Sequence, residues 1–145
     1  MTAQTVADYF LTLGDPEAGD GISNMKIQKL LDYAQGVHLA MANKPLFDDP
    51  IEAWRFGPVV PDVYHRFKTH GFESIPVPRD FDVSALSADQ RSILGDVNEA
   101  YGQFSAWKLR DMTHDEAPWR DADSRGPNSV ITHEALRAFF LTRLV

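Results

Sequence analysis

The chain of 145 residues contains no cysteine, so it can form neither a disulfide framework nor a thiolate metal site. No apolar run approaches the roughly 20 residues that a membrane-spanning helix needs. The N-terminus shows no basic stretch followed by an apolar one, which is the pattern of a secretory signal. The sequence therefore predicts a cytoplasmic protein that neither spans nor crosses a membrane.

Basic residues are also scarce, since 14 Lys and Arg stand against 21 Asp and Glu and give a formal net charge of −7. Nucleic-acid binding requires a basic face, so a nucleic-acid partner is not expected. The acidic residues gather in two segments: residues 1–23 hold no lysine or arginine, and residues 80–104 hold Arg91 alone. These segments are either a solvated acidic surface or a contact surface for a basic partner.

The common catalytic motifs are missing. The glycines of segment 14–21 lack the flanking strand and lysine of a phosphate-binding loop, and no Gly-x-Ser-x-Gly sequence occurs. The pair Asp48-Asp49 stands beside a proline, where carboxylates usually serve turn formation and not acid–base catalysis. The sequence gives no positive reason to expect an enzyme.

None of the five histidines belongs to a His-Glu-x-x-His pair. His38 lies within an apolar stripe, where a core histidine with one satisfied hydrogen bond is expected. The run His114-Asp115-Glu116 joins three polar groups, but adjacent side chains point in different directions and rarely converge on one ion. We therefore expect no metal and no cofactor, and keep a metal site or an uncharacterised hydrolase at this run only as alternatives.

The apolar spacing predicts a mainly α, compact single-domain helical bundle over residues 1–145, with a small β-hairpin. Polar loops are expected at residues 14–21 and 72–86. The expected helices cover residues 5–13, 23–42, 61–70, 87–102, 105–112 and 132–145. The hairpin is expected to pair Leu46-Phe47 with Ala53-Trp54 around the turn 48–50.

The helix over residues 23–42 is expected to be central. Ser23 is a suitable N-cap, and Gly36 in the helix interior costs about 1 kcal/mol relative to alanine, which indicates close approach by a neighbouring element. The apolar stripe of this helix consists of Ile27, Leu30, Leu31, Ala34, Val37, His38 and Met41. Ser87 and Gln90 form a capping box for a later helix.

Two corners combine aromatic residues with proline. The first, Glu52–Phe67, places large rings and two arginines around the rigid turn Gly57-Pro58 and around Pro61, which can begin a helix. In the second, Thr113 is expected to cap a turn with Glu116, and Pro118 to direct Trp119. Because Trp, Tyr and Arg dominate interface hot spots, these corners predict a protein-binding surface. Its candidate residues are Trp54, Arg55, Phe56, Tyr64 and Trp119. Packing in the core is the alternative role for the same rings.

In this order the segments resemble the Panacea domain, also described as the phage-associated GepA-like or SocA-like family. The resemblance rests on the run from Ser23 to His38, on Glu-Ala-Trp-Arg-Phe-Gly-Pro-Val-Val-Pro at 52–61, and on Met-Thr-His-x-Glu-x-Pro-Trp at 112–119. It extends to the closing segment 131–140 and covers nearly the whole chain. One departure is Asp32, where an aromatic or apolar residue is more usual, and it leaves the exposure of that helix face open.

The resemblance implies an antitoxin of a two-gene toxin–antitoxin system, whose partner is a protein toxin encoded nearby. The SocA-like branch implies a proteolytic adaptor that delivers the toxin to an AAA+ protease such as ClpXP. Direct occlusion of the toxin without proteolysis is the alternative. A DNA-binding autorepressor is a further one, although the acidic balance argues against it.

Overall fold

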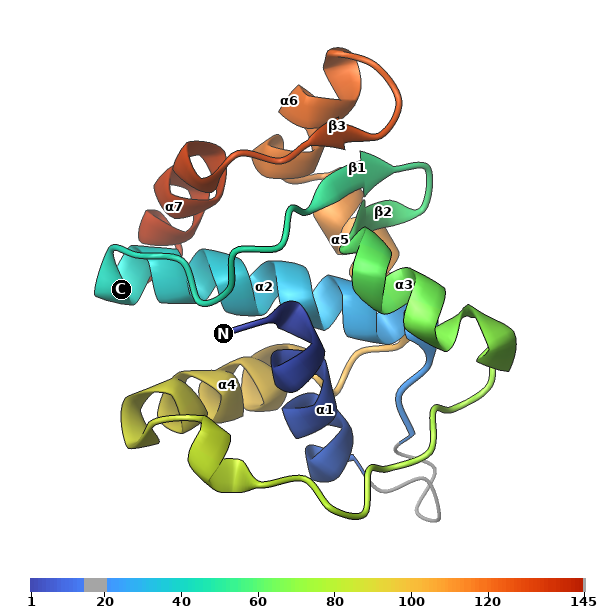
Figure 1. Cartoon of the computed structure of the whole chain (residues 1–145). Coiled ribbons are helices and arrows are strands. Elements are labelled where there is room, and N and C mark those ends of the chain that lie inside the picture. The colour runs from blue at the N-terminus through green and yellow to red at the C-terminus, as the bar shows by residue number, and fades with distance from the viewer. Residues whose placement is uncertain (15–20, 145) are drawn as a thin grey trace.

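The computed structural model describes residues 1–14 and 21–144, so most of the predicted loop 14–21 lies outside the described residues. Within these two ranges the chain folds into seven α-helices and one three-stranded antiparallel sheet (Figure 1). The helices are α1 (Ala3–Leu13), α2 (Asn24–Ala42), α3 (Pro61–Phe67), α4 (Ala88–Tyr101), α5 (Ala106–His114), α6 (Ala117–Ser124) and α7 (His133–Leu141). The strands are β1 (Glu52–Trp54), β2 (Gly57–Val59) and β3 (Ser129–Val130). The predicted mainly α-helical bundle with a small β component is confirmed.

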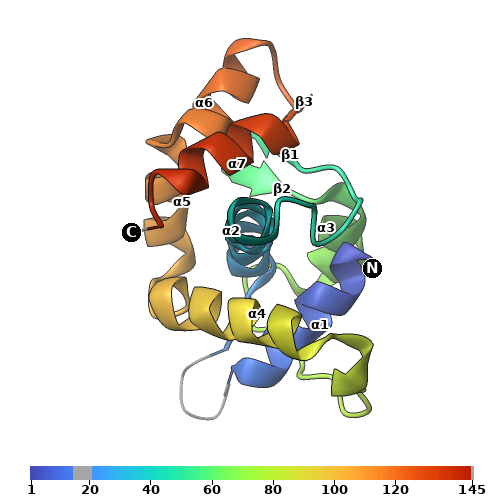
Figure 2. The ribbon, with the colours of Figure 1, turned by 90° about the vertical axis from the view of Figure 1, so that its left-hand side faces the viewer.

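Helix α2 is the axis of the bundle, as the sequence predicts. Figure 2 looks nearly along it and shows the other helices and the sheet arranged around it. The Ser23 hydroxyl accepts a hydrogen bond from the Lys26 amide at 3.2 Å and caps the helix start. Every residue from Ile27 to Leu39 is buried, including the polar ones, whereas the predicted stripe member Met41 is exposed. A helix surrounded on all sides buries every face, so one apolar stripe describes it poorly.

Gly36 allows α7 to pack closely on α2. A Cβ atom placed on Gly36 would lie 2.2 Å from two ring carbons of the Phe140 side chain, which is fully buried. The predicted reason for a glycine inside this helix is therefore confirmed. Two residues further on, Nδ1 of buried His38 lies 2.8 Å from the Lys44 carbonyl oxygen, the single hydrogen bond expected of a core histidine.

The predicted hairpin is wrong in its partners. Strand β1 pairs with β2 through a turn at Arg55-Phe56, and with β3 on its other edge. Leu46 and Phe47 form no strand because their backbone groups are hydrogen-bonded to the Gln35 side chain of α2. Gln35 Oε1 accepts from the Leu46 amide at 2.7 Å and from the Phe47 amide at 3.3 Å. Its Nε2 also donates to the Phe47 carbonyl at 2.7 Å.

Helix caps follow the sequence closely, with one exception. The Ser87 and Gln90 capping box is confirmed, and Ser105 and Thr132 cap α5 and α7 through their hydroxyls. The predicted Thr113 and Glu116 cap is wrong, because Thr113 lies inside the last turn of α5 and donates to the Arg110 carbonyl at 2.9 Å. In the part of the chain that the structure describes, no helix is both long enough and apolar enough to cross a bilayer.

Candidate protein-binding surface

The structure brings Trp54, Tyr64 and Trp119 together from three different elements. The Trp54 and Tyr64 rings meet edge to face with centroids 5.0 Å apart. Trp119 Nε1 donates to the Trp54 carbonyl at 2.9 Å, and the Trp119 ring stacks on His114 with centroids 3.9 Å apart. Trp54 Nε1 donates to Glu52 Oε1 at 2.8 Å, so the indole N–H groups of Trp54 and Trp119, which are both half-buried, each have an acceptor. Trp119 therefore positions the strand that bears Trp54.

The other two predicted residues, Arg55 and Phe56, form the exposed tip of the β1–β2 turn. The Phe56 side chain is 45% exposed, and the Arg55 guanidinium carbon lies 5.5 Å from its ring centroid. Gly57 follows with φ +116°, a conformation that L residues rarely adopt, and it closes the turn. The tip thus presents a ring and a cation to solvent on a rigid two-residue turn.

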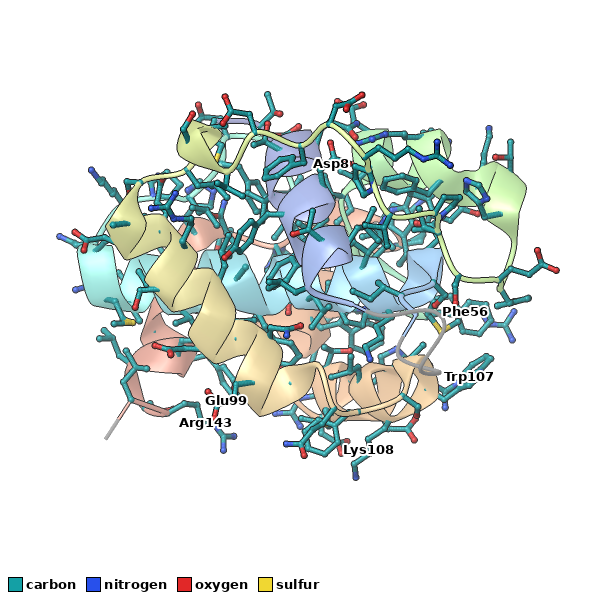
Figure 3. The ribbon with its side chains drawn as sticks, turned by 90° about the horizontal axis from the view of Figure 1, so that it is seen from below. Asp8, Phe56, Glu99, Trp107, Lys108 and Arg143 are labelled. Atoms are coloured by element: carbon teal, nitrogen blue, oxygen red, sulfur yellow. The ribbon has the colours of Figure 1, made fainter. Side chains whose placement is uncertain are left out.

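Trp107 of α5 extends this exposed surface, although the sequence analysis did not single it out. Its side chain is 49% exposed, and its ring meets Phe56 edge to face with centroids 6.1 Å apart. Figure 3 shows the two residues side by side, well away from Glu99 and Arg143. The signal was present in the sequence: Trp107 is the second residue of a helix whose buried position is Leu109, so it falls on the opposite face. Large exposed apolar side chains that adjoin one another are unusual on a monomer.

A cleft of about 350 Å³ lies beside this tip, between the start of α2, the hairpin and α3. We call it the aromatic cleft, because Trp54, Phe56, Tyr64 and Phe72 line it together with Met25 and Val59. Four of the five predicted site residues line it, and Trp119 lies behind it. Phe72, at the rim, is 80% exposed. The cleft has the apolar, aromatic lining that is typical of recognition sites.

The charge of the aromatic cleft is opposite to that of the whole chain. Lys29, Arg55 and Lys68 line it, and among residues 1–14 and 21–144 no aspartate or glutamate does. The complete chain has 21 acidic residues and a formal net charge of −7. The cleft is therefore a cationic site on an acidic protein, which favours an anionic partner.

The alternative metal site at residues 114–116 is not assembled. His114 stacks on Trp119, Asp115 is exposed, and Glu116 Oε2 accepts a hydrogen bond from the Tyr33 hydroxyl at 2.9 Å. Across residues 1–14 and 21–144, no group of three or more His, Asp or Glu side chains is placed to hold a metal ion. The His114 and Glu116 side chains instead make two separate contacts, and the Asp115 side chain is exposed.

Two carboxyl groups, that of Asp32 on α2 and that of half-buried Glu116 before α6, lie near each other. Asp32 is buried, and its Oδ1 atom has no hydrogen-bond partner within the described ranges. Burial, and secondarily the nearby Glu116, raises the pKa of Asp32 well above its ordinary value. Burial likewise raises the pKa of Glu116 to about 7. The helix face that bears Asp32 is therefore buried, and its carboxyl is favoured in the neutral form.

These shifts predict that the folded protein loses stability as the pH rises from 5 to 7.5. Folding raises both pKa values, so in this pH range the native state holds protons that the unfolded state has released. The stability that these bound protons contribute is fully present below the pKa of the unfolded state, and it is lost as the pH rises through the pKa of the folded state. We expect Asp32→Asn to flatten the decline by about 2 kcal/mol, because an amide cannot ionise. Urea unfolding across this range measures it, with Asp96→Asn on the exposed face of α4 as the control.

If the free energy of unfolding falls equally steeply with pH in wild type and in Asp32→Asn, Asp32 is not a neutral, buried carboxyl group. The pH window matters because burial lowers the pKa of Lys29 to about 8. That depressed value makes stability rise between pH 8 and 10.5, in the opposite direction. Measurements below pH 7.5 therefore separate the carboxyl groups from the lysine.

The fold and the cleft together define a helical domain built on one buried helix, with an aromatic, cation-lined cleft at one end. The chain belongs to the SocA-like antitoxin family: the family model "Antitoxin SocA-like, Panacea domain" matches residues 27–120. The chain is also 32% identical over 126 residues to "Antitoxin SocA" of Caulobacter vibrioides. That match covers 74% of this chain and 63% of the relative, so the chain spans less than two thirds of the relative's length. No solved structure matches.

Proposed function

We propose that this chain is an antitoxin that binds and neutralises a protein toxin encoded beside it, and that the toxin contacts the aromatic cleft. The proposal rests on one observation: three exposed rings, Phe56, Phe72 and Trp107, surround or adjoin a cation-lined cleft in a chain that belongs to an antitoxin family. In this proposal Trp54, Arg55, Phe56 and Tyr64 contact the toxin, and Trp119 supports them. The chain acts by binding and transforms nothing.

The finer mechanism that we propose is delivery of the bound toxin to an AAA+ protease such as ClpXP. An adaptor needs two separate surfaces, one for the cargo and one for the protease. The exposed acidic residues Asp89, Asp96 and Glu99 of α4 supply a second surface of opposite charge. Figure 3 shows Glu99 far from Phe56 and Trp107, so a toxin seated in the cleft leaves this face accessible. Direct occlusion without proteolysis is the alternative mechanism.

Co-expression with the product of the neighbouring gene tests both levels of the proposal. We expect the neighbour alone to stop growth and this chain to restore it, with the two proteins purifying together. In cells that lack the protease, an adaptor no longer restores growth and the toxin accumulates, whereas an occluding antitoxin still restores growth. A neighbour that is harmless, or that does not bind this chain, would refute the antitoxin function.

A further inference from the structure

Lys29 of α2 lies at the floor of the aromatic cleft. Its side chain is 1% exposed, yet it is one of the residues that line the cleft. The stem passes directly beneath Gly57 at the hairpin turn: a Cβ atom on Gly57 would lie 2.6 Å from Lys29 Cε and 3.2 Å from Nζ. The absence of a side chain at Gly57 therefore makes room for the lysine.

The Lys29 ammonium group makes no hydrogen bond and no ion pair among residues 1–14 and 21–144, although nearby Asp32 attracts it electrostatically. The ion pairs found there are Arg66 with Asp8 and Arg110 with Asp111, and no hydrogen bond of Lys29 Nζ is found. Asp32, three residues along the same helix, makes no ion pair with Lys29, and its own Oδ1 atom is also without a partner. A buried lysine without a carboxylate or carbonyl is rare, because burial of an unpaired charge costs several kcal/mol.

The neighbouring polar groups of the cleft are already used. Gln28 Oε1 accepts from the Val60 amide at 2.9 Å, and Gln28 Nε2 donates to Asn24 Oδ1 at 2.8 Å. Asn24 Nδ2 donates in turn to the Tyr64 carbonyl at 3.1 Å. These bonds fix the cleft wall, and Lys29 is the charged group at the cleft floor, with Arg55 and Lys68 at the rim.

We propose that Lys29 binds the carboxylate of an aspartate or glutamate on an apolar segment of the toxin, which inserts into the aromatic cleft. This inference rests on the proposed function and adds the chemistry of the contact. The rings of Trp54, Phe56 and Tyr64 would pack against the apolar residues that flank the carboxylate. The exposed Arg55 and Lys68 at the rim attract an acidic segment and repel a basic one.

The electrostatics of the aromatic cleft agree with this occupant. Burial lowers the pKa of Lys29 to about 8, opposed by Asp32 and assisted by Arg110, so the ammonium form is less favoured than in an exposed lysine but still predominates at pH 7. An incoming carboxylate supplies the missing counter-charge where water is largely excluded. Such a buried pair is screened less by salt than a surface pair. Removing one of its partners is costly, because the other charge is then left buried and unpaired.

The Lys29→Met variant tests the inference, because it keeps the length of the side chain and removes its charge. We expect it to be at least as thermally stable as wild type, since replacing an unpaired buried charge by an apolar group is neutral or favourable. We expect it to bind the purified neighbour-encoded toxin about 30-fold more weakly or worse, because the toxin carboxylate is then buried unpaired. The control is Lys44→Met, at an exposed site just after α2.

Substitutions in the toxin identify the carboxylate that Lys29 binds. Among single Asp→Asn and Glu→Gln changes in the toxin, we expect one to weaken binding to wild type and to have no further effect on Lys29→Met. If wild-type antitoxin binds the toxin but Lys29→Met binds equally well, the inference is wrong and the proposed function stands. If wild type binds no toxin, both fail. A dimer of this chain that Lys29→Met dissociates would assign the cleft to a second copy and overturn the inference.

Discussion

A double variant with Phe56→Ala and Trp107→Ala is expected to bind the toxin about 100-fold more weakly than wild type while melting at a similar temperature. The two rings contact each other and are each about half exposed, so their removal creates no core cavity. We take a loss of about 1.4 kcal/mol for each ring, which is within the range of interface anchor residues; each such loss is tenfold in affinity, so the two give about 100-fold. Titration calorimetry with purified toxin measures the change.

The matched control for this variant is Met41→Ala with Leu141→Ala. These two side chains are also apolar and exposed, at 55% and 43%, but they lie outside the aromatic cleft. We expect this control to bind the toxin as wild type does. Equal loss of binding in both double variants would show that affinity follows total exposed apolar surface. Unchanged binding in the Phe56 and Trp107 variant would exclude this pair from the contact surface.

The largest effect on stability is expected from Phe140→Ala, which should lower the free energy of unfolding by about 3–5 kcal/mol. The Phe140 ring is fully buried between α7 and α2, and it meets the Tyr33 ring edge to face with centroids 5.6 Å apart. Alanine loses that contact and leaves a cavity against the backbone of Gly36. Chemical denaturation at pH 7 measures the loss, and Leu141→Ala, one residue further on and exposed, is the control.

The same contact predicts that Gly36→Ala is destabilising, although alanine is the better helix former by about 1 kcal/mol. A Cβ atom 2.2 Å from the Phe140 ring forces the ring and α7 to move, and overpacking of this kind costs about 1–3 kcal/mol. In the Phe140→Ala background the obstacle is gone, so we expect Gly36→Ala to be neutral or stabilising there. Additive effects of the two changes would contradict direct packing of Phe140 on Gly36.

Six of the seven helices found in residues 1–14 and 21–144 could be predicted from the sequence because their signals are local. The sequence analysis did not predict α6, whose N-cap residue Glu116 makes no side-chain cap hydrogen bond. Ser23, Ser87, Ser105 and Thr132 each supply a hydroxyl at the start of an apolar-periodic segment, and each caps a helix. The glycine within α2 also predicted a close neighbour, although it could not say that the neighbour is Phe140. These features depend on residues a few positions apart, which a sequence shows directly.

The errors arise where partners lie far apart in the chain. The amides of Leu46 and Phe47 are occupied by Gln35, eleven and twelve residues earlier, and strand β3 pairs with β1 across more than 70 residues. No local pattern shows either contact. In the same way, the sequence gives no sign that Lys29 differs from other helix residues. It lines the cleft because the hairpin turn at Gly57 packs over it.

The candidate site was therefore predicted in part. Proline and aromatic residues concentrated in one segment indicated a rigid corner that brings Trp54 and Tyr64 together, but the hairpin turn was expected at residues 48–50 and lies at Arg55-Phe56. The contribution of α5 through Trp107, and that of α2 through Lys29, depend on how the helices pack around the hairpin. Whether the toxin contacts these residues remains a prediction.

The central claim is that the toxin sits on the aromatic cleft, and site-specific photo-crosslinking tests it most directly. A benzophenone amino acid would replace Phe56 in one variant and Glu99, on the distant face of α4, in another. The account predicts that light links the toxin to position 56 and not to position 99. Efficient linkage at position 99, with none at position 56, would contradict it.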